Sequence, residues 1–409
     1  MDTEVTRKRE RIMLRRTRAA IGGTAGIAAV ALALAGCSAG GTDSGSTDAP
    51  AAGVTYMDMA TGECAAPPAE GVDFDDAKAY LDSFAGQATG LLTDEQLPEP
   101  ITSDTLVVYL DDGSPYSSVL AEYTGDAATA SGAQYQSVNV GSDAQSVNSG
   151  MNSVVALDPD VVITFTTNLT FWQDQYQALT DAGTAIVYAG NANATDFGLN
   201  QTFGTSDASV VNASVIAAAA IVATCGTATN FVYYPAPEIV ASVDMLSSYT
   251  DYINDHVPNA TVRSVDISIM DTDGASKIVS DLQAHPETEF CSPSSDQWQI
   301  GLADKAKLAG ITNAYCFGGI SLPQNYQQIK DGTQVGTLAY DPAVQSWQAL
   351  DEGFRKLEGV FQDYNMDDLI RLVGLAVTQQ NIGRMDIETG TFEAVPNFQE
   401  KYLALWNGN

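Results

Sequence analysis

The stretch Leu106-Val-Val-Tyr-Leu110, followed by Asp111-Asp112-Gly113, sets the fold of this chain. A short apolar run with β-branched and aromatic residues and a turn directly after it is typical of a strand buried on both faces. A helix over 115–131 and a strand over Gln134–Val140 are predicted next. The same alternation continues with helices over Asp143–Leu157 and 170–182 and strands over Val161–Phe165 and Ala185–Tyr188. Apolar strands separated by helices predict a parallel sheet covered on both faces.

A second alternation begins after an Ala-rich helix predicted over Asp207–Cys225. Its predicted strands are Asn230–Tyr234, Thr261–Ile267, Glu289–Ser292, Ala314–Phe317 and Val335–Tyr340, with helices notably over 274–284, 296–309 and 322–331. The sequence therefore predicts an α/β protein of two Rossmann-like, doubly wound lobes in series. Ligands of such open sheets bind beyond the carboxyl ends of the strands. Two lobes that face one another there would enclose a cleft.

The amino-terminal region predicts export and lipidation. Residues 1–18 contain seven Lys or Arg, and the uncharged run Ala19–Gly36 ends in Leu34-Ala-Gly-Cys37. A basic segment, an apolar run and small residues before a cut describe a signal peptide, here 1–36. The last four residues resemble the bacterial lipobox, which implies a diacylglyceryl group on Cys37 and a place on the extracellular face of the cell membrane. A single transmembrane helix is the alternative.

Residues 37–53 predict a flexible tether, because Ser, Gly, Thr, Asp, Ala and Pro are too polar to build a core. An N-terminal extension over 54–103 follows, helix-like around Asp76–Phe84 and then Pro-rich. The sequence assigns no role to this extension.

The charge of the mature chain excludes several partners. Outside the leader the sequence keeps 11 basic and 48 acidic residues, a net charge of −37. Nucleic acid and anionic lipid headgroups both need positive charge on the protein, so neither is an expected partner. The excess of acid indicates solubility outside the cell. The sequence contains no Asp-x-Asp-x-Asp-Gly calcium loop, and we expect no metal and no cofactor.

Four cysteines remain after the lipidated one: Cys64, Cys225, Cys291 and Cys316. An even number in an exported chain predicts two disulfides. Their spacing is not that of a zinc site. Four cysteines allow three pairings, and their positions in the sequence do not choose among them.

Beyond the predicted leader and tether, the sequence contains no motif of the common enzyme classes: no Gly-x-x-x-x-Gly-Lys-Ser/Thr, no His-Glu-x-x-His, no Gly-x-Ser-x-Gly and no Gly-x-Gly-x-x-Gly after the first strand. It has two histidines, His256 and His285, and neither is beside an obvious nucleophile. We therefore predict a binding protein and not an enzyme. Hydrolysis of cell-wall glycans by paired carboxylates is the alternative that so many acidic residues leave open.

Several short segments follow one another in a recognisable order. Asp296-Gln-Trp-Gln-Ile-Gly301 is similar to Asn-Asp-x-x-Ala-x-Gly, and Ala314-Tyr-Cys-Phe-Gly-Gly319 stands in the place of Val-Val-Gly-Phe-Asp-Gly. Gly336-Thr-Leu-Ala-Tyr-Asp-Pro342 is similar to Ala-Thr-Val-x-Gln-x-Pro, and Ser114-Pro-Tyr116 stands where Asn-Pro-Phe is expected. In this order the segments resemble the type I periplasmic binding proteins of sugar-class ABC importers, the ribose- and galactose-binding-like group. The resemblance covers roughly Thr105–Gly359.

The resemblance implies two lobes joined by a three-crossing hinge. The implied boundaries are 104–206 plus 335–361 for lobe 1 and 207–334 plus 362–409 for lobe 2. It also implies that Cys291 pairs with Cys316, and Cys64 with Cys225. A monomer is expected, working with an ABC permease in the membrane.

The resemblance also implies which residues line the cleft. They are Asp112, Ser114 and Tyr116 after the first strand, Asn191 after the fourth, Ser295, Asp296, Trp298 and Gly318 in lobe 2, and Tyr340 at the hinge. Aromatic faces cover the C–H surface of a sugar, while hydroxyl and amide groups meet its hydroxyls. Core packing is the alternative for Trp298, capping of the following turn for Asp112, and a surface position for Tyr116.

Several positions depart from the family pattern. Its Asp-Arg after the fourth strand is Gly190-Asn191 here, the Asp of Phe-Asp-Gly is Gly318, and the hinge Gln is Tyr340. The Arg that the family has in lobe 2, near the segment 234–238, is missing. Small and aromatic residues thus replace charged ones, which indicates a ligand that is larger, less polar or differently substituted than a simple aldose. Two other binding roles stay open. One is a sensor of the same fold that presents to a membrane receptor, and the other is a siderophore-binding protein, for which a single long linking helix would be expected.

Overall fold

The first sheet has the elements that the opening stretch predicts. The computed structural model describes residues 53–165, 167–188, 206–312 and 314–407. The elements of the first half are β1 (Leu106–Asp111), α2 (Pro115–Ser131), β2 (Gln134–Asn139), α3 (Ala144–Ala156), β3 (Val161–Thr164), η1 (Leu169–Phe171), α4 (Gln173–Ala182) and β4 (Ala185–Tyr188). The four strands pair in parallel in the order β2-β1-β3-β4. The predicted leader, tether and Cys37, together with Gly190 and Asn191, lie outside the described residues.

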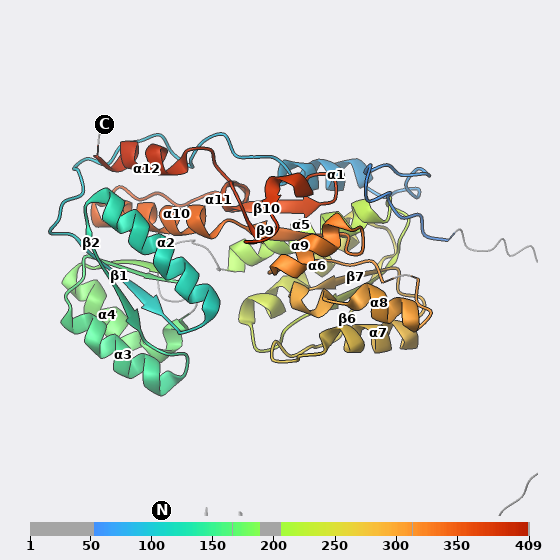
Figure 1. The fold of residues 1–409 in the computed structure, drawn as a ribbon, viewed down its shortest axis with the longest axis horizontal. Coiled ribbons are helices and arrows are strands. Elements are labelled where there is room, and N and C mark those ends of the chain that lie inside the picture. The colour runs from blue at the N-terminus through green and yellow to red at the C-terminus, as the bar shows by residue number, and fades with distance from the viewer. Residues whose placement is uncertain (1–52, 166, 189–205, 313, 408–409) are drawn as a thin grey trace, which may run out of the picture. The chain divides into compact units, whose positions relative to one another are not determined.

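Alternate residues of β1 belong to two different cores. Val107 and Tyr109 pack in the cluster shared with α2 and α10 (Pro342–Leu357). Val108 and Leu110 pack in a second cluster with α3 and α4. All four are fully buried. Because successive side chains of a strand point to opposite faces, a run without polar residues needs helices on both sides, and the sheet has them (Figure 1).

The second half contains two three-stranded ladders. Its elements are α5 (Ser206–Ala223), β5 (Asn230–Tyr234), α6 (Val240–His256), β6 (Thr261–Ser264), α7 (Gly274–Ala284), β7 (Phe290–Pro293), η3 (Asp296–Gln299), α8 (Leu302–Leu308), β8 (Phe317–Gly319), α9 (Pro323–Lys330), β9 (Gly336–Tyr340) and β10 (Gly374–Thr378). The ladders have the orders β6-β5-β7 and β10-β9-β8. A parallel bridge between Cys291 and Cys316 joins β7 to the segment before β8. All neighbours are parallel except β10, which is antiparallel to β9.

Two predicted elements of this half differ from the structure. The helix predicted over 296–309 is broken into η3 and α8, because Gly301 between them takes a left-handed backbone with φ of 75°. The strand predicted over Ala314–Phe317 begins at Phe317 and continues to Gly319. Of the residues 314–316, which were also predicted in this strand, only Cys316 forms a β-bridge, and its partner is Cys291 of β7.

The second half of helix α5 is apolar on every side. Its residues Ala213 and Val215–Ala220 are all buried, and such a helix needs partners all round. It packs against β7 and β8 on one side and against α6, α11 (Met366–Val373) and α1 (Phe74–Ser83) elsewhere. The helical segment predicted in the N-terminal extension is therefore α1, and it covers α5.

The chain passes between the halves at both ends of α10. Strand β9 leads into α10, which packs on β3 and β4 of the first sheet. The chain then returns through α11 to β10. Among the described residues the halves are thus joined by more than one segment, which does not match the single linking helix expected of a siderophore-binding protein. The remaining passage expected of a three-crossing hinge lies in 189–205, outside the described residues.

Two of the implied boundary segments need correction. Residues 335–340 were expected in lobe 1, but β9 pairs with β8 and β10 of the second half. The end of 362–409 was expected in lobe 2, but α12 (Phe398–Asn407) packs on α10 and α2 of the first half. Contacts of Trp406 explain the position of α12. Trp406 stacks on Trp347 of α10, with ring centroids 5.3 Å apart, and its indole N–H donates to Asp351.

The N-terminal extension contacts both halves. Cys64 forms a disulfide with Cys225 at the end of α5. Further along, the Leu97 N–H donates to the Leu405 carbonyl, and Arg355 of α10 donates to the Glu95 carbonyl. Cys291 and Cys316 form the second disulfide, so both implied pairings are confirmed.

The remaining short elements are η4 (Ile382–Arg384), β11 (Met385–Asp386) and β12 (Thr391–Phe392). Within the described ranges, no helix is both long and apolar enough to cross a membrane. The same residues contain no cluster of three or more His, Cys, Asp or Glu suited to a metal ion.

Candidate functional site

The loop after β1 holds three of the predicted site residues. Ser114 caps α2 by accepting from the Ser117 N–H (3.2 Å), and Pro115 follows it in the first turn, where a missing N–H costs nothing. The carboxylate of Asp112 accepts from the Ser114 N–H at 2.8 Å. Both polar side chains thus stabilise the turn. For Asp112 this matches the turn-capping alternative.

Tyr116 lies in the first turn of α2, directly after this loop, and the residue is 48% exposed. Its hydroxyl donates to Gln345 Oε1 of α10 at 2.7 Å, which fixes the ring at the surface of the first half. Sequence reasoning missed Gln345, because nothing in α10 marks this glutamine among its polar residues.

Tyr340 ends β9 and is half-buried. Its hydroxyl donates to Asn212 Oδ1 of α5 at 2.5 Å. Burial raises the pKa of Tyr340, and the nearby Tyr116 adds to this effect. The two tyrosines predicted for the cleft therefore lie near each other where β9 leads into α10. Asn212 was missed. The signal that could have found it is a lone Asn in an Ala- and Val-rich helix, where a polar side chain needs a hydrogen-bond partner.

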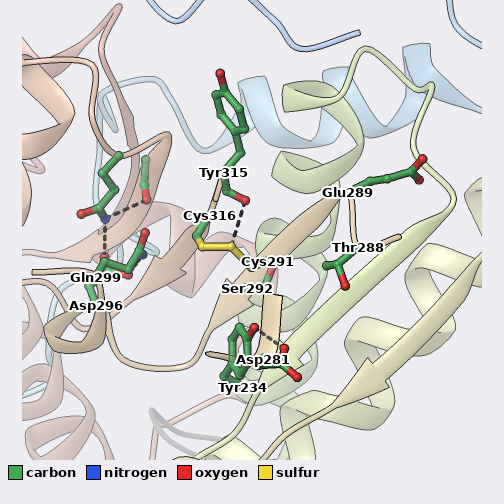
Figure 2. Close-up of a disulfide and its surroundings, with 12 residues drawn as sticks. Tyr234, Asp281, Thr288, Glu289, Cys291, Ser292, Asp296, Gln299, Tyr315 and Cys316 are labelled. Carbon is green, nitrogen blue, oxygen red and sulfur yellow. Dashed lines mark hydrogen bonds between the residues drawn. A yellow bond between two sulfur atoms is a disulfide. The ribbon is translucent and has the colours of Figure 1, made fainter. Parts of the chain in front are cut away.

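Asp296 is fully buried, close to the disulfide between β7 and the segment before β8 (Figure 2). Its carboxylate accepts hydrogen bonds from Gln299 (2.5 Å), Ser321 (2.6 Å) and Gln334 (3.1 Å). Burial raises the pKa of Asp296 to about 6, while these donors oppose the rise. A carboxylate with this many internal partners organises the loops around it.

The donors to Asp296 come from separate elements. Gln299 lies in η3, Ser321 follows β8, and Gln334 precedes β9. Ser321 also contacts Thr337 Oγ1 at 2.5 Å. No local pattern in the sequence marks these residues, since the strands bring them together only on folding.

Gly318 and Ser295 belong to the same region. A Cβ on Gly318 would overlap Asp296 Oδ1 and lie 2.5 Å from the Pro293 carbonyl oxygen. Ser295 is buried immediately before η3. The structure therefore brings Ser295, Asp296 and Gly318 together at the carboxyl ends of β7 and β8.

Trp298 lies in a core and not on a surface. Its side chain is 1% exposed and packs with Ile278, Leu282 and Ala306 of α7 and α8. A Cβ on Gly274 would overlap the indole ring, so the ring is tightly enclosed. A cleft-lining role is therefore wrong for Trp298, and the core-packing alternative holds.

A cavity among the described residues lies on a different side of the second half. It has a volume of about 310 Å³ and is lined by residues before β8 and β9, among them Lys307, Tyr315 and Val335, with Met59 of the extension. These residues are at the amino ends of the strands, away from the predicted site.

Comparison with known proteins identifies the fold. No protein-family model and no curated protein matches the sequence. Among solved structures, a solute-binding protein of an ABC transporter from Burkholderia graminis with D-arabinose is 14% identical, covering 69% of this chain and 98% of its own, with a TM-score of 0.55. A 5-methylthioribose transporter solute-binding protein from Thermotoga lettingae is 13% identical, covering 77% and 100%, with a TM-score of 0.58.

A third structure, the periplasmic binding protein of the arabinose ABC transporter from Shewanella sp. ANA-3, is 16% identical over 68% of this chain and 93% of its own, with a TM-score of 0.55. The fold of this chain is that of the type I periplasmic binding proteins. The particular proteins that it is similar to are binding proteins of transporters, with D-arabinose, 5-methylthioribose and L-arabinofuranose bound in their structures, and none of the three is described as an enzyme.

Proposed function

We propose that this chain is an extracellular solute-binding protein without catalytic activity. It captures a small, polar, sugar-like molecule and delivers it to the permease of an ABC importer. The observation that supports this most directly is the fold, in which Tyr116, Tyr340, Ser295 and Gly318 all lie at the carboxyl ends of strands or shortly after them, in both halves. Similar structures contain bound D-arabinose and 5-methylthioribose, which supports a sugar-like ligand for this chain.

Hinge closure is the proposed mechanism. A ligand that contacts both halves only in the closed form shifts the equilibrium between open and closed states. A shift from 1:99 to 99:1 requires about 5.5 kcal/mol of differential affinity, which a few buried hydrogen bonds and stacked rings supply. The passages at the two ends of α10 are the segments that would bend.

The anchor is part of the same proposal. A diacylglyceryl group on Cys37 would hold the protein on the outer face of the cell membrane, where single-chain acylation binds only weakly. Metabolic labelling with a radioactive fatty acid tests it. Label should appear in the natural chain and be lost in Cys37→Ser. Equal labelling of both chains would remove the anchor from the proposal.

Binding is tested with the full chain carrying Cys37→Ser, exported and purified from the medium. Thermal unfolding is followed against sugars, polyols and nucleosides. A ligand at 100 times its Kd stabilises the folded state by about 2.7 kcal/mol, a readily measured shift. Small-angle scattering with the same ligand should show a smaller radius of gyration. Binding without any such change would argue against hinge closure.

A further inference from the structure

Exposed apolar side chains collect at the carboxyl ends of the strands. Among the described residues, ten large apolar side chains are exposed, and seven of them lie within nine residues after the end of a strand. These seven are Tyr116, Val119, Val243, Met270, Ile300, Ile320 and Leu322. Single exposed apolar residues need no explanation, but their concentration after strand ends does.

Ile320 is the most unusual of the seven. It directly follows β8, its side chain is 60% exposed, and its φ is 56°. The left-handed backbone favours glycine and is an outlier for a β-branched residue. No other Val, Ile or Thr of the described chain has a positive φ. Strained residues of this kind persist only where the surroundings hold them, and they gather at ligand sites.

The buried carboxylate of Asp296 holds this loop in place. Ser321 turns inward and donates to Asp296 Oδ2 at 2.6 Å, while its neighbours Ile320 and Leu322 are both exposed. The Leu322 N–H donates to Asn325 Oδ1 (3.0 Å), and Asn325 Nδ2 donates to the Asp296 carbonyl (2.8 Å). The polar groups of the loop are thus satisfied inside the protein, and the loop presents two aliphatic side chains to solvent.

The loop after β1, in the first half, also turns its polar side chains inward and its apolar side chains outward. In the loop after β1, Asp111 and Asp112 accept from backbone N–H groups two residues ahead, and Ser114 caps α2. The side chains that extend beyond these turns are Tyr116 and Val119. In the loops after β1 and β8, polar side chains therefore form hydrogen bonds within the protein, and apolar side chains are exposed to solvent.

We propose that the ligand is a sugar bearing an uncharged apolar substituent, such as an alkyl or aryl glycoside, and that Ile320 and Leu322 contact this substituent. The inference rests on the proposed function and specifies its ligand class. Burying a side chain such as Ile contributes enough free energy to change affinity about tenfold or more. Such contacts discriminate a substituted sugar from its parent.

The test compares matched pairs of ligands. The exported Cys37→Ser chain is titrated calorimetrically with D-ribose, L-arabinose, D-galactose and D-glucose, and with the phenyl and butyl glycosides of each. At least one glycoside should bind about tenfold more tightly than its parent sugar. Ile320→Asn should abolish most of that preference and change the affinity for the parent less than twofold. Because Asn tolerates the left-handed backbone, this variant should fold with an unchanged or higher Tm.

Leu308→Asn is the matched control. Leu308 is 89% exposed at the end of α8, away from the strand ends, so this variant should keep the preference. If parent sugars bind as tightly as glycosides, the inference is overturned and the proposed function stands. If no sugar or glycoside of the panel binds, the inference is overturned, and if the polyols and nucleosides of the thermal screen also fail to bind, the proposed function is overturned as well. If Ile320→Asn alters the radius of gyration of the unliganded protein and not the glycoside preference, the apolar edge serves contact between the halves and the inference is wrong.

Discussion

The carboxylate of Asp296 occupies the space that a side chain at position 318 would need. A Cβ on Gly318 would overlap Asp296 Oδ1 and lie 2.5 Å from the Pro293 carbonyl. The neighbouring Gly319 has open surroundings, since the nearest atoms to its Cβ position are Leu338 O at 3.9 Å and Ile216 Cδ1 at 4.0 Å. The glycine at position 318 is thus required by a buried carboxylate that comes from a different element.

Gly318→Ala is expected to lower the free energy of unfolding by about 1–3 kcal/mol, the usual cost of forcing an extra methyl group into a packed site. Gly319→Ala, one residue on, is the control and should change it much less. Urea denaturation of both variants measures the difference. Equal stability of the two variants would show that the Asp296 side chain moves aside at little cost.

Trp298 and Tyr116 should respond in opposite ways to substitution. Trp298→Phe removes volume from a core and should cost about 1–3 kcal/mol of stability, without changing ligand affinity more than twofold. Tyr116→Ala alters an exposed ring and should change stability by no more than about 1 kcal/mol, while lowering affinity about tenfold. Chemical denaturation and calorimetric titration of both variants give the two quantities. A loss of affinity in Trp298→Phe would place the indole near the ligand after all.

The pH dependence of stability should be dominated by Glu352 of α10. Burial raises the pKa of Glu352 to about 7, although Lys356 Nζ lies 2.7 Å from its carboxylate, and Asp351 and Asp363 reinforce the rise. A carboxyl with a raised pKa binds more protons in the folded state, so stability falls as the pH rises through the window from about 4.5 to 7. The fall is at most about 3 kcal/mol. Glu352→Gln cannot ionise and should flatten this slope.

Urea denaturation of the natural chain and of Glu352→Gln at pH 5, 6, 7 and 8 measures that slope. Asp296 titrates in an overlapping range, because burial raises its pKa to about 6, but it contributes equally to both proteins. The difference between the two curves therefore isolates Glu352. Parallel curves would mean that Lys356 keeps this carboxylate ionised throughout the range.

The disulfide between Cys64 and Cys225 should contribute more stability than the other one. It closes a loop of 161 residues, against 25 for Cys291 and Cys316. The chain-entropy model gives about 5 and 3.5 kcal/mol for loops of these lengths. In Cys64→Ala/Cys225→Ala, limited proteolysis should cut the extension near residues 57–72, where the natural chain resists. Unchanged resistance would show that hydrogen bonds such as the one from the Met57 N–H to the Ala223 carbonyl hold the segment alone.

The candidate site was predictable only in part. Sequence position identified the loops after β1, β7 and β8, because in an open sheet the strand ends are known once the strands are. It did not identify Gln345, Asn212 or Ser321, whose partners are more than 20 residues away along the chain. It also did not distinguish Trp298 in a core from Tyr116 at a surface, since both aromatic residues follow strands.

The sequence by itself determined the alternation of strands and helices, the parallel pairing of apolar strands and the division into two α/β halves. These features follow from patterns of neighbouring residues, and β1 to β4 lie within a residue or two of their predicted bounds. Only the tertiary structure decided where β9 and α12 belong and which polar groups surround Asp296. Those outcomes depend on contacts between residues far apart in the chain, such as Trp347 with Trp406, and local sequence does not encode such contacts.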